Sequence, residues 1–299
     1  MASPSELARA LSALALASAL GLRGRRSQSL SPTGALAAFL VGFLSCLASV
    51  RFGATLIAFY LASTRATRFR AAEKARLEDG FSTAHGNRSA AQVFASSLPA
   101  VAVALFYLVV FRFDAPVTPA FPTRSCLLLA YLLFFAACAG DTFSSEVGFV
   151  LSPPGVDPLL ITQPWRRVPR GTNGGVSFQG TVASAVGGVV VGSVYFLASP
   201  EWSFSQLWLV LVGLVGGVVG SILDSVIGAI MQASWLDTAS GKVLKVPPPK
   251  EAQVKGRFQH ICGFDILSGE SVNLLAGVFT MAAAPLLMGL FAVEYPGGI

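Results

Sequence analysis

Two carboxylates stand close together in the polar segment of residues 139–148, which follows a long apolar stretch. Asp141 and Glu146 lie within two helical turns of each other if this segment is helical, since one turn takes about 3.6 residues. Such a pair can hold Mg²⁺, which binds one or two protein carboxylates and completes its shell with water and phosphate oxygens. A pair of solvated side chains at a helix end is the alternative interpretation.

A third carboxylate, Asp224, lies inside the apolar block of residues 206–230. It stands about six residues past the centre of that block, which is roughly 9 Å along a helix. An ionisable residue within a membrane segment indicates a functional site by default. We expect Asp224, with Ser225 and Gln232, to face the same cavity as Asp141. A hydrogen bond from Asp224 to a neighbouring helix is the alternative.

A glycine-rich turn with basic residues upstream precedes another apolar segment. The turn and its neighbours are Gly171, Thr172, Asn173, Gly174 and Gly175, with Arg166, Arg167 and Arg170 before them. Glycine lets the backbone turn several amides toward one point, and the N-terminus of the helix that follows favours an anion. Arginine forks bind phosphate oxygens in pairs, so the segment predicts a phosphate-binding turn. An ordinary surface turn is the alternative, because Gly, Asn and Thr are typical of turns as well.

Other loops hold polar residues that can complete such a site. In the loop of residues 64–91, Lys74 or Arg88 can reach a bound phosphate, although most cations there are expected to serve topology and lipid headgroups. Asp265 and Asn273 lead into the last apolar segment, where Asp265 can join the acidic set. The four cysteines lack the spacing of metal ligands and are expected to be free packing residues.

The composition places these residues in a membrane protein. Of the 299 residues, 54% are hydrophobic and only 12% are charged, and the mean hydropathy is +0.67. Soluble domains carry about 25% charged residues. The apolar residues fall in long blocks, as a bilayer requires. The net charge of +6 comes from Lys and Arg beside apolar segments, a pattern typical of membrane orientation rather than of nucleic-acid binding.

Apolar segments of about 20 residues can each span roughly 30 Å of hydrocarbon. The candidates are residues 7–22, 92–111, 124–140, 178–198, 206–230 and 271–293. The first is expected to be a retained helix rather than a signal peptide, because its arginines follow the apolar stretch. Residues 34–63 are too many for one upright helix. A hairpin with Arg51 at an interface avoids burying that charge at mid-bilayer, which would cost about 2.5–3.5 kcal/mol.

The hairpin gives an all-α, polytopic transmembrane helix bundle of about eight crossings, within a range of roughly six to eight. It also sorts the charges, because one side of the membrane then carries 17 of the 21 Lys and Arg residues. That side is cytoplasmic or its organellar equivalent. We expect a single domain over residues 1–299, whose longest polar loop is 231–270. Pro247, Pro248 and Pro249 in that loop disfavour both helix and sheet.

In this order, the segments resemble the transmembrane protein 19 family of integral membrane proteins, which includes the plant phytyl-phosphate kinases. The resemblance covers about residues 34–275 and rests on a set of short motifs. These are Gly34-Ala-Leu-Ala, Val41-Gly-Phe, Gln92-Val, Ala139-Gly-Asp-Thr, Ser145-Glu146, Val168-Pro, Gly171-Thr-Asn-Gly-Gly, Asp224-Ser, Gly228-Ala, Gln232, Asp265-Ile-Leu and Val272-Asn. The chain departs from the family pattern at Gly86-Asn-Arg-Ser and at Ser96-Ser97.

The resemblance implies a membrane kinase that adds a phosphate to an isoprenoid-alcohol monophosphate such as phytyl phosphate. A nucleoside triphosphate would be the donor. CTP is expected, because the family is more remotely similar to dolichol kinases and phosphatidate cytidylyltransferases. Mg²⁺ would be held by Asp141, Glu146 or Asp224. The amides of residues 171–175, with Arg166, Arg167 or Lys74, would position the phosphates.

A transporter or a non-catalytic membrane protein is the competing class. A transporter is expected to place polar and discontinuous elements near the bilayer midplane. Mid-span charges are almost absent from these segments, which disfavours that class. The expected partners are membrane lipids and the isoprenoid phosphate, without nucleic acid. Endoplasmic reticulum and plastid envelope are both compatible with the N-terminus, which is rich in Ala, Ser and Arg.

Overall fold

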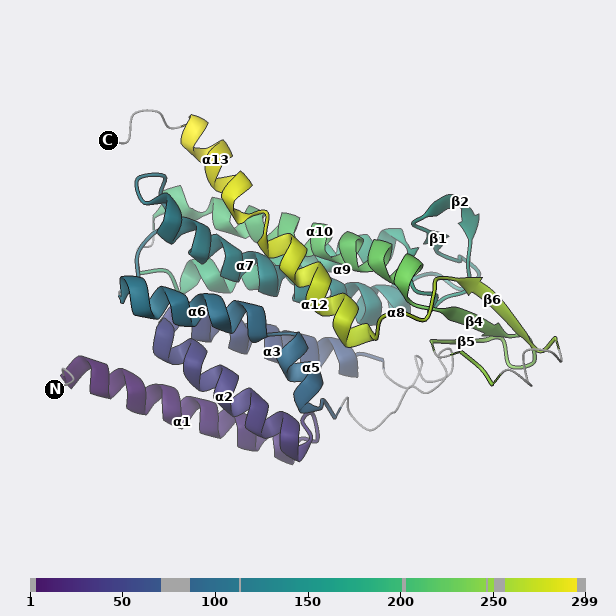
Figure 1. The fold of residues 1–299 in the computed structure, drawn as a ribbon, viewed down its shortest axis with the longest axis horizontal. Helices are drawn as coiled ribbons and strands as arrows, with labels where there is room; N and C mark the ends of the chain where they lie inside the picture. The colour runs from purple at the N-terminus through teal and green to yellow at the C-terminus, as the bar shows by residue number, and fades with distance from the viewer. Residues whose placement is uncertain are drawn as a thin grey trace.

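The helices lie side by side along the longest axis of the molecule, and two small sheets lie at one end (Figure 1). The computed structural model describes residues 4–70, 87–112, 114–200, 203–245, 247–249 and 256–294. The helices are α1 (Pro4–Arg26), α2 (Pro32–Ala48), α3 (Val50–Arg68), α5 (Ala90–Ala95), α6 (Leu98–Phe111), α7 (Pro122–Phe143), η1 (Ser144–Gly148), α8 (Phe149–Leu151), α9 (Phe178–Leu197), η2 (Phe204–Gln206), α10 (Trp208–Met231), α12 (Gly269–Met281) and α13 (Ala284–Glu294). We call the end with the sheets the basic end, because the sheets form in the described parts of two predicted basic loops, 141–177 and 231–270.

Several of the helices are long enough to cross a membrane. In the described ranges, five stretches are long and apolar enough to do so unaided: Leu7–Arg26, Pro122–Leu151, Phe178–Leu197, Phe204–Met231 and Gly269–Leu290. Two shorter apolar helices, α2 and α6, lie among them, and α3 runs beside α2. Together they make the eight passes that the sequence predicts. An even number of passes brings the first and the last helix end to the same side. In agreement, α1 begins and α13 ends at the end of the bundle opposite the sheets (Figure 1).

Residues 34–63 form the predicted hairpin. α2 ends at Ala48 and α3 begins at Val50, while Ser49 between them has an extended backbone. Oγ of Ser49 accepts a hydrogen bond from the amide of Arg51 at 3.0 Å and so caps α3. The side chain of Arg51 is buried completely inside the protein at the tip of the hairpin, which the sequence does not predict.

α7 is the centre of the bundle. It contacts α3, α6, α9, α10 and α12. In its apolar stretch, 72% of the residues are buried inside the protein, compared with 33% in the apolar stretch of α10. A helix that is apolar on all sides is expected in such a central position. Its last turn, which carries Asp141, is therefore held by neighbouring helices rather than exposed to lipid.

Small residues let α7, α9 and α10 approach closely, as the glycine-rich sequences predict. Gly217 of α10 lies where three backbones meet. A Cβ on Gly217 would be 2.8 Å from Cα of Gly188 on α9, and a Cβ on Gly140 of α7 would be 2.6 Å from Cα of Gly217. No side chain larger than hydrogen fits there. Close van der Waals packing of this kind is what holds helices together in lipid.

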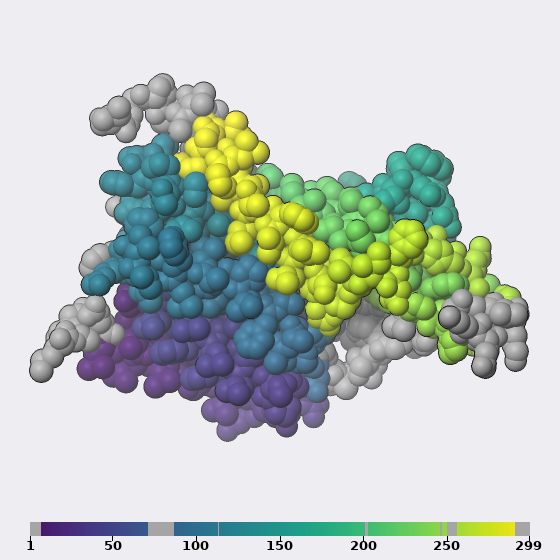
Figure 2. Space-filling model, viewed as in Figure 1, coloured from purple at the N-terminus to yellow at the C-terminus, as the bar shows by residue number. Residues whose placement is uncertain are grey.

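Two three-stranded antiparallel sheets form in the polar loops, which project beyond the helices at the basic end (Figure 2). Their strands are β1 (Leu159–Leu160), β2 (Gln163–Arg167), β3 (Gly175–Val176), β4 (Ser234–Asp237), β5 (Lys242–Leu244) and β6 (Phe258–Cys262). The bundle is thus helical, as the sequence predicts. The polar loops contain two sheets, which the sequence does not predict. Pro247–Pro249 belong to no strand, as expected of prolines, but they fall in the connection between β5 and β6 and so leave room for a sheet that the sequence does not predict.

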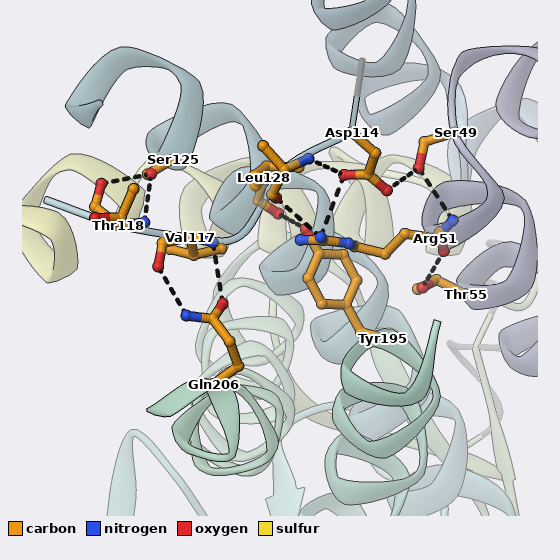
Figure 3. A network of polar contacts seen from close by, with 11 residues as sticks. Ser49, Arg51, Thr55, Asp114, Val117, Thr118, Ser125, Leu128, Tyr195 and Gln206 are labelled. Atoms are coloured by element: carbon orange, nitrogen blue, oxygen red, sulfur yellow. Dashed lines mark hydrogen bonds and ion pairs between the residues drawn. The ribbon is translucent and has the colours of Figure 1, made fainter. Parts of the chain in front are cut away.

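A buried polar network closes the end of the bundle opposite the sheets (Figure 3). Nη2 of Arg51 donates to the carbonyl oxygen of Ala115 at 2.9 Å and lies 3.2 Å from Oδ1 of Asp114. Oγ of Ser49 donates to Oδ2 of Asp114 at 2.6 Å. The guanidinium of Arg51 also lies over the ring of Tyr195, 5.0 Å from its centroid. The network ties α3 and α9 to the loop that precedes α7.

Asp114→Ala is expected to destabilise the protein, because it leaves the buried charge of Arg51 without its partner. Removing one member of a buried pair costs about 3–5 kcal/mol. Thermal unfolding in detergent measures the loss, with Asp157→Ala on an exposed loop as the matched control. The double variant Arg51→Met, Asp114→Ala should regain part of the stability. Equal melting temperatures for Asp114→Ala and Asp157→Ala would show that the pair is not needed.

Candidate functional site

A polar cavity opens at the basic end between α7, α9, α10, α12 and the loops. It encloses about 1210 Å³, part of which is open to solvent. The predicted site residues that line it are Asp141, Glu146, Gly171, Thr172, Asn173, Gly174, Gly175, Asp224, Ser225, Gln232 and Asn273. Residues far apart in the sequence therefore share one cavity.

The carboxyl groups of Asp141 and Asp224 meet because α7 and α10 run in the same direction. Ala137 of α7 packs against Gly220 of α10. Four residues further along both helices, a rise of roughly 6 Å, the next pair is Asp141 and Asp224. Their side chains lie within hydrogen-bonding reach of each other. Two carboxyl groups this close are expected to share either a proton or a cation between them.

Asn273 of α12 fixes the orientation of Asp224. In the amide orientation that satisfies both neighbours, Nδ2 of Asn273 donates to Oδ2 of Asp224 at 2.8 Å and to the carbonyl oxygen of Gly269 at 3.2 Å. The carboxylate of Asp224 is thus held between α7 and α12. No group of three or more His, Cys, Asp and Glu side chains suited to a metal ion occurs in the part of the chain that the structure describes.

Glu146 reaches the cavity from the π-helical turn η1 at the end of α7. A π turn contains an extra residue, which changes the direction of the side chains that follow, and such turns are frequent at functional sites. Close packing accompanies the turn, since a Cβ on Gly148 would be 2.8 Å from the amide nitrogen of Gly180 on α9. The expected proximity of Asp141 and Glu146 thus arises through an irregular turn rather than a straight helix.

The glycine turn packs directly on α10. Gly174 has φ of +77°, a conformation that favours glycine, and a Cβ there would collide with Cβ of Ala229 and lie 2.8 Å from the carbonyl oxygen of Ser225. The turn offers an anion fewer donors than its glycine content predicts. The amides of Thr172, Asn173 and Gly175 already donate to protein oxygens at 3.0–3.2 Å. The prediction that all amides of residues 171–175 hold phosphate is therefore too broad.

Two helix N-termini contribute residues to the polar cavity: that of α9, which the sequence predicts, and that of α12, which it does not. Ser177 caps α9 and Ser268 caps α12, each accepting a backbone amide, and the first-turn residues Gly180 and Gly269 line the cavity. The N-terminus of a helix carries a partial positive charge that attracts anions. Gly180 and Gly269 share this cavity with Asp141 and Asp224, so an anion bound at either terminus would lie in the same cavity as the carboxyl pair.

Only one of the three arginines upstream of the glycine turn lines the cavity. Arg166 and Arg167 lie on β2 and do not line the cavity, whereas Arg170 and Lys245 do. Proximity in sequence misleads here, because β1 lies between β2 and β3 in the sheet and so separates Arg166 and Arg167 from Gly175. Lys245 follows β5 in the proline-containing loop, and no motif marks it. Asp265 lies on an exposed loop outside the cavity.

Two predicted phosphate ligands remain. Arg88 lines a different cavity, between α1, α2 and α3, and not the polar cavity. Lys74 lies outside the described residues.

The second sheet supports the glycine turn from the outside. Oγ of Ser234 on β4 accepts a hydrogen bond from the amide of Asn173 at 3.0 Å. The sheet is fastened by an ion pair of 2.7 Å between Arg257 and Asp237, and the guanidinium holds the pKa of the Asp237 carboxyl well below its usual range. The strands of this sheet, which the sequence does not predict, thus help to position the glycine turn, which it does predict.

The fold and the polar cavity define a multi-pass integral membrane protein with a polar site at one face of the membrane. The family described as "Integral membrane protein DUF92" matches residues 15–281, and the chain belongs to this family. This membership confirms the family resemblance predicted from the motifs.

Curated relatives come from plants and microorganisms. The chain is 29% identical over 281 residues to Protein PGR of Arabidopsis thaliana, covering 91% of this chain and 93% of that protein. It is 28% identical over 214 residues to an uncharacterized membrane protein of Methanocaldococcus jannaschii, covering 71% of this chain and 79% of the relative. No solved structure matches the chain. The relatives therefore establish a family of membrane proteins without assigning an activity.

Gly174→Ala is expected to displace the glycine turn from α10, because the new Cβ collides with Ala229. Gly155→Ala is the matched control, since Gly155 has the same φ of +77° but a Cβ there would have no neighbouring atom within 4 Å. Both variants lose about 1–2 kcal/mol from the left-handed backbone. Gly174→Ala should lose roughly 1–3 kcal/mol more by overpacking, measured as thermal unfolding in detergent. Equal losses would show that the turn does not depend on α10.

Proposed function

We propose that this protein is a membrane kinase that transfers a phosphoryl group from a nucleoside triphosphate to an isoprenoid-alcohol monophosphate. The observation that supports this most is the meeting of Asp141 and Asp224 in a cavity that also receives the N-termini of α9 and α12. Carboxylates suit a cation and helix N-termini suit phosphates. The two features together fit a magnesium-bound polyphosphate better than they fit a cation alone or a phosphate alone.

The carboxylates present fit a magnesium ion of the kind that accompanies a nucleotide. Mg²⁺ takes one or two protein carboxylates and leaves its other positions to water and phosphate oxygens, and Asp141 and Asp224 supply two adjacent carboxylates. Glu146 lines the same cavity. When bound, the ion would neutralise charge that develops on the phosphate oxygens.

The other residues of the cavity have positioning roles in this proposal. Phosphoryl transfer needs alignment and charge neutralisation more than covalent help from the protein. An oxygen of the lipid monophosphate attacks the γ-phosphorus, and the bond from that phosphorus to the β,γ-bridging oxygen breaks. Arg170, Lys245 and the two helix N-termini hold the phosphates in line, and Asn273 keeps Asp224 oriented. CTP is the donor to test first, because of the wider family resemblance described above.

The position of the polar groups favours an enzyme over a transporter. Transporters place their polar site near the bilayer midplane, where it must open to both sides. Here the polar cavity lies at the basic end, and the far end is closed by the Arg51 network. A site that is accessible from one face is sufficient for phosphoryl transfer to a lipid whose headgroup lies at that face.

Purified protein given phytyl monophosphate, Mg²⁺ and CTP labelled on the γ-phosphate is expected to produce labelled phytyl diphosphate. Asp141→Asn and Asp224→Asn should each lower the rate by roughly 10²-fold or more, because each removes charge from the reacting centre. Asp265→Asn is the matched control, since that carboxylate lies at the same face but outside the cavity.

Three results would contradict the proposal. These are undiminished activity of both cavity variants, activity that persists in excess chelator, and release of entrapped phytyl phosphate from proteoliposomes without any labelled diphosphate.

A further inference from the structure

A second hollow opens beside the polar cavity, between Arg70 after the end of α3, the end of α8 and the loop that follows α8. It offers a ligand about 510 Å³ of space. Pockets for small molecules typically enclose roughly 300–1,000 Å³. Ser152 and Arg170 line both spaces, so this side hollow adjoins the polar cavity. Its other described walls are Arg70, Val150, Leu151, Pro153, Pro154 and Gly155.

The side hollow lies at the surface of the membrane rather than in the hydrocarbon. α9 has 20 residues, which rise about 30 Å, so it needs its full length to cross the bilayer and its first turn lies at the surface. Oγ of Ser152 donates a hydrogen bond to Oγ of Ser177, the residue that caps α9, at 3.4 Å. Residues 153–157, which follow Ser152, are all exposed. A ligand therefore reaches the side hollow from the water beside the membrane.

Arg170 lies where the side hollow meets the polar cavity. Its Nη2 donates to the carbonyl oxygens of Pro153 and, at 3.3 Å, Val156, and so holds the loop that forms one wall. The other two guanidinium nitrogens make no hydrogen bond within the described ranges and can donate to a phosphate that passes between the two spaces. Arg70 adds a second cation to the side hollow. The described walls thus combine apolar surface with positive charge.

We propose that the side hollow binds the nucleoside of the phosphate donor, while its triphosphate extends past Arg170 into the polar cavity. The inference rests on the proposed function for the nature of the donor, and it goes beyond it by placing the base and sugar. Each face of a nucleobase is flat and weakly polar, so it can pack on Leu151, Pro153 and Pro154, and a guanidinium such as that of Arg70 stacks on aromatic rings.

The position of the side hollow favours the nucleoside over the other reactant. An isoprenoid chain gains most by remaining in the hydrocarbon, whereas this space opens at the membrane surface. A ligand that fills both spaces needs an apolar, water-soluble part joined to several phosphates. A nucleoside triphosphate has both parts.

A CTP analogue with an azide on its base tests the placement in the unaltered protein. Photolysis in the presence of Mg²⁺ should attach the base to residues 150–155, as mapped by mass spectrometry of peptides. Excess CTP and excess inorganic tripolyphosphate should each prevent the labelling, because both occupy the phosphate positions. Labelling that CTP prevents but that falls on the glycine turn or β5, with residues 150–155 unlabelled, would overturn the inference.

Leu151→Ala removes part of the apolar wall, and Leu159→Ala removes the same side chain from β1, outside both spaces, as the matched control. The two leucines are 51% and 40% exposed, so neither truncation is expected to disturb folding. Leu151→Ala should raise the Kd of CTP about tenfold, the effect of removing roughly two buried methylene groups, and leave the Kd of tripolyphosphate unchanged. A Kd of CTP equal to that of Leu159→Ala would contradict the placement, as would an equal change for CTP and tripolyphosphate.

The two proposals fail in different ways. A Kd of CTP raised by Leu151→Ala alone, without any labelled phytyl diphosphate, would leave the nucleoside site standing and remove the kinase. Labelled phytyl diphosphate formed by Leu151→Ala with the KM for CTP of Leu159→Ala would support the kinase and overturn the nucleoside site. Absence of binding of both CTP and ATP to the unaltered protein would overturn both.

Discussion

The close contact of three helix backbones at Gly217 is the constraint on which the rest of the structure depends. Lipid provides no hydrophobic force between helices, so α7, α9 and α10 associate through the contact that only glycine allows at Gly140, Gly188 and Gly217. This contact fixes the register of α7 against α10. The two aspartates then meet one turn beyond Ala137 and Gly220. A sliding of one helix by a single turn would separate the carboxyl groups by roughly 5.4 Å.

The two ends of the bundle have different roles: the far end stabilises the fold, and the basic end holds the candidate site. At the far end, Arg51 is buried against Asp114 and Tyr195, and this network fastens the helices where no cavity is needed. At the basic end the backbone is irregular, with the π turn η1, the glycine turn and two short sheets. Irregular backbone is tolerated in membrane proteins where it lines a water-filled space or protein rather than lipid. The rigid end thus permits an open end that can be shaped around ligands.

Hydropathy and charge sorting are sufficient to predict the passes and the hairpin at Ser49, because the bilayer acts on each segment separately. The convergence of Asp141, Asp224 and the glycine turn follows from the same topology, which brings their helix ends to one face. Contacts between segments are different. Nothing near Arg51 reveals that Asp114 neutralises it, and strands as short as β1 and β3 leave no period-two pattern to detect. Lys245 and the N-terminus of α12 join the site only through the fold of the loop between α10 and α12.

A polar cavity at the end of an apolar helix bundle suits two reactants that dissolve in different solvents. A nucleotide dissolves in water, whereas an isoprenoid chain dissolves in lipid, so their phosphates can meet only where both solvents are within reach. The carboxyl pair lines both the polar cavity, which is partly open to solvent, and a smaller hollow whose walls include Phe59 and Ala276. Displacing water from phosphates at such a boundary strengthens their interaction with fixed charges. In the proposed reaction the entry of the chain would itself exclude water, so binding of the lipid would help to prepare the site for transfer.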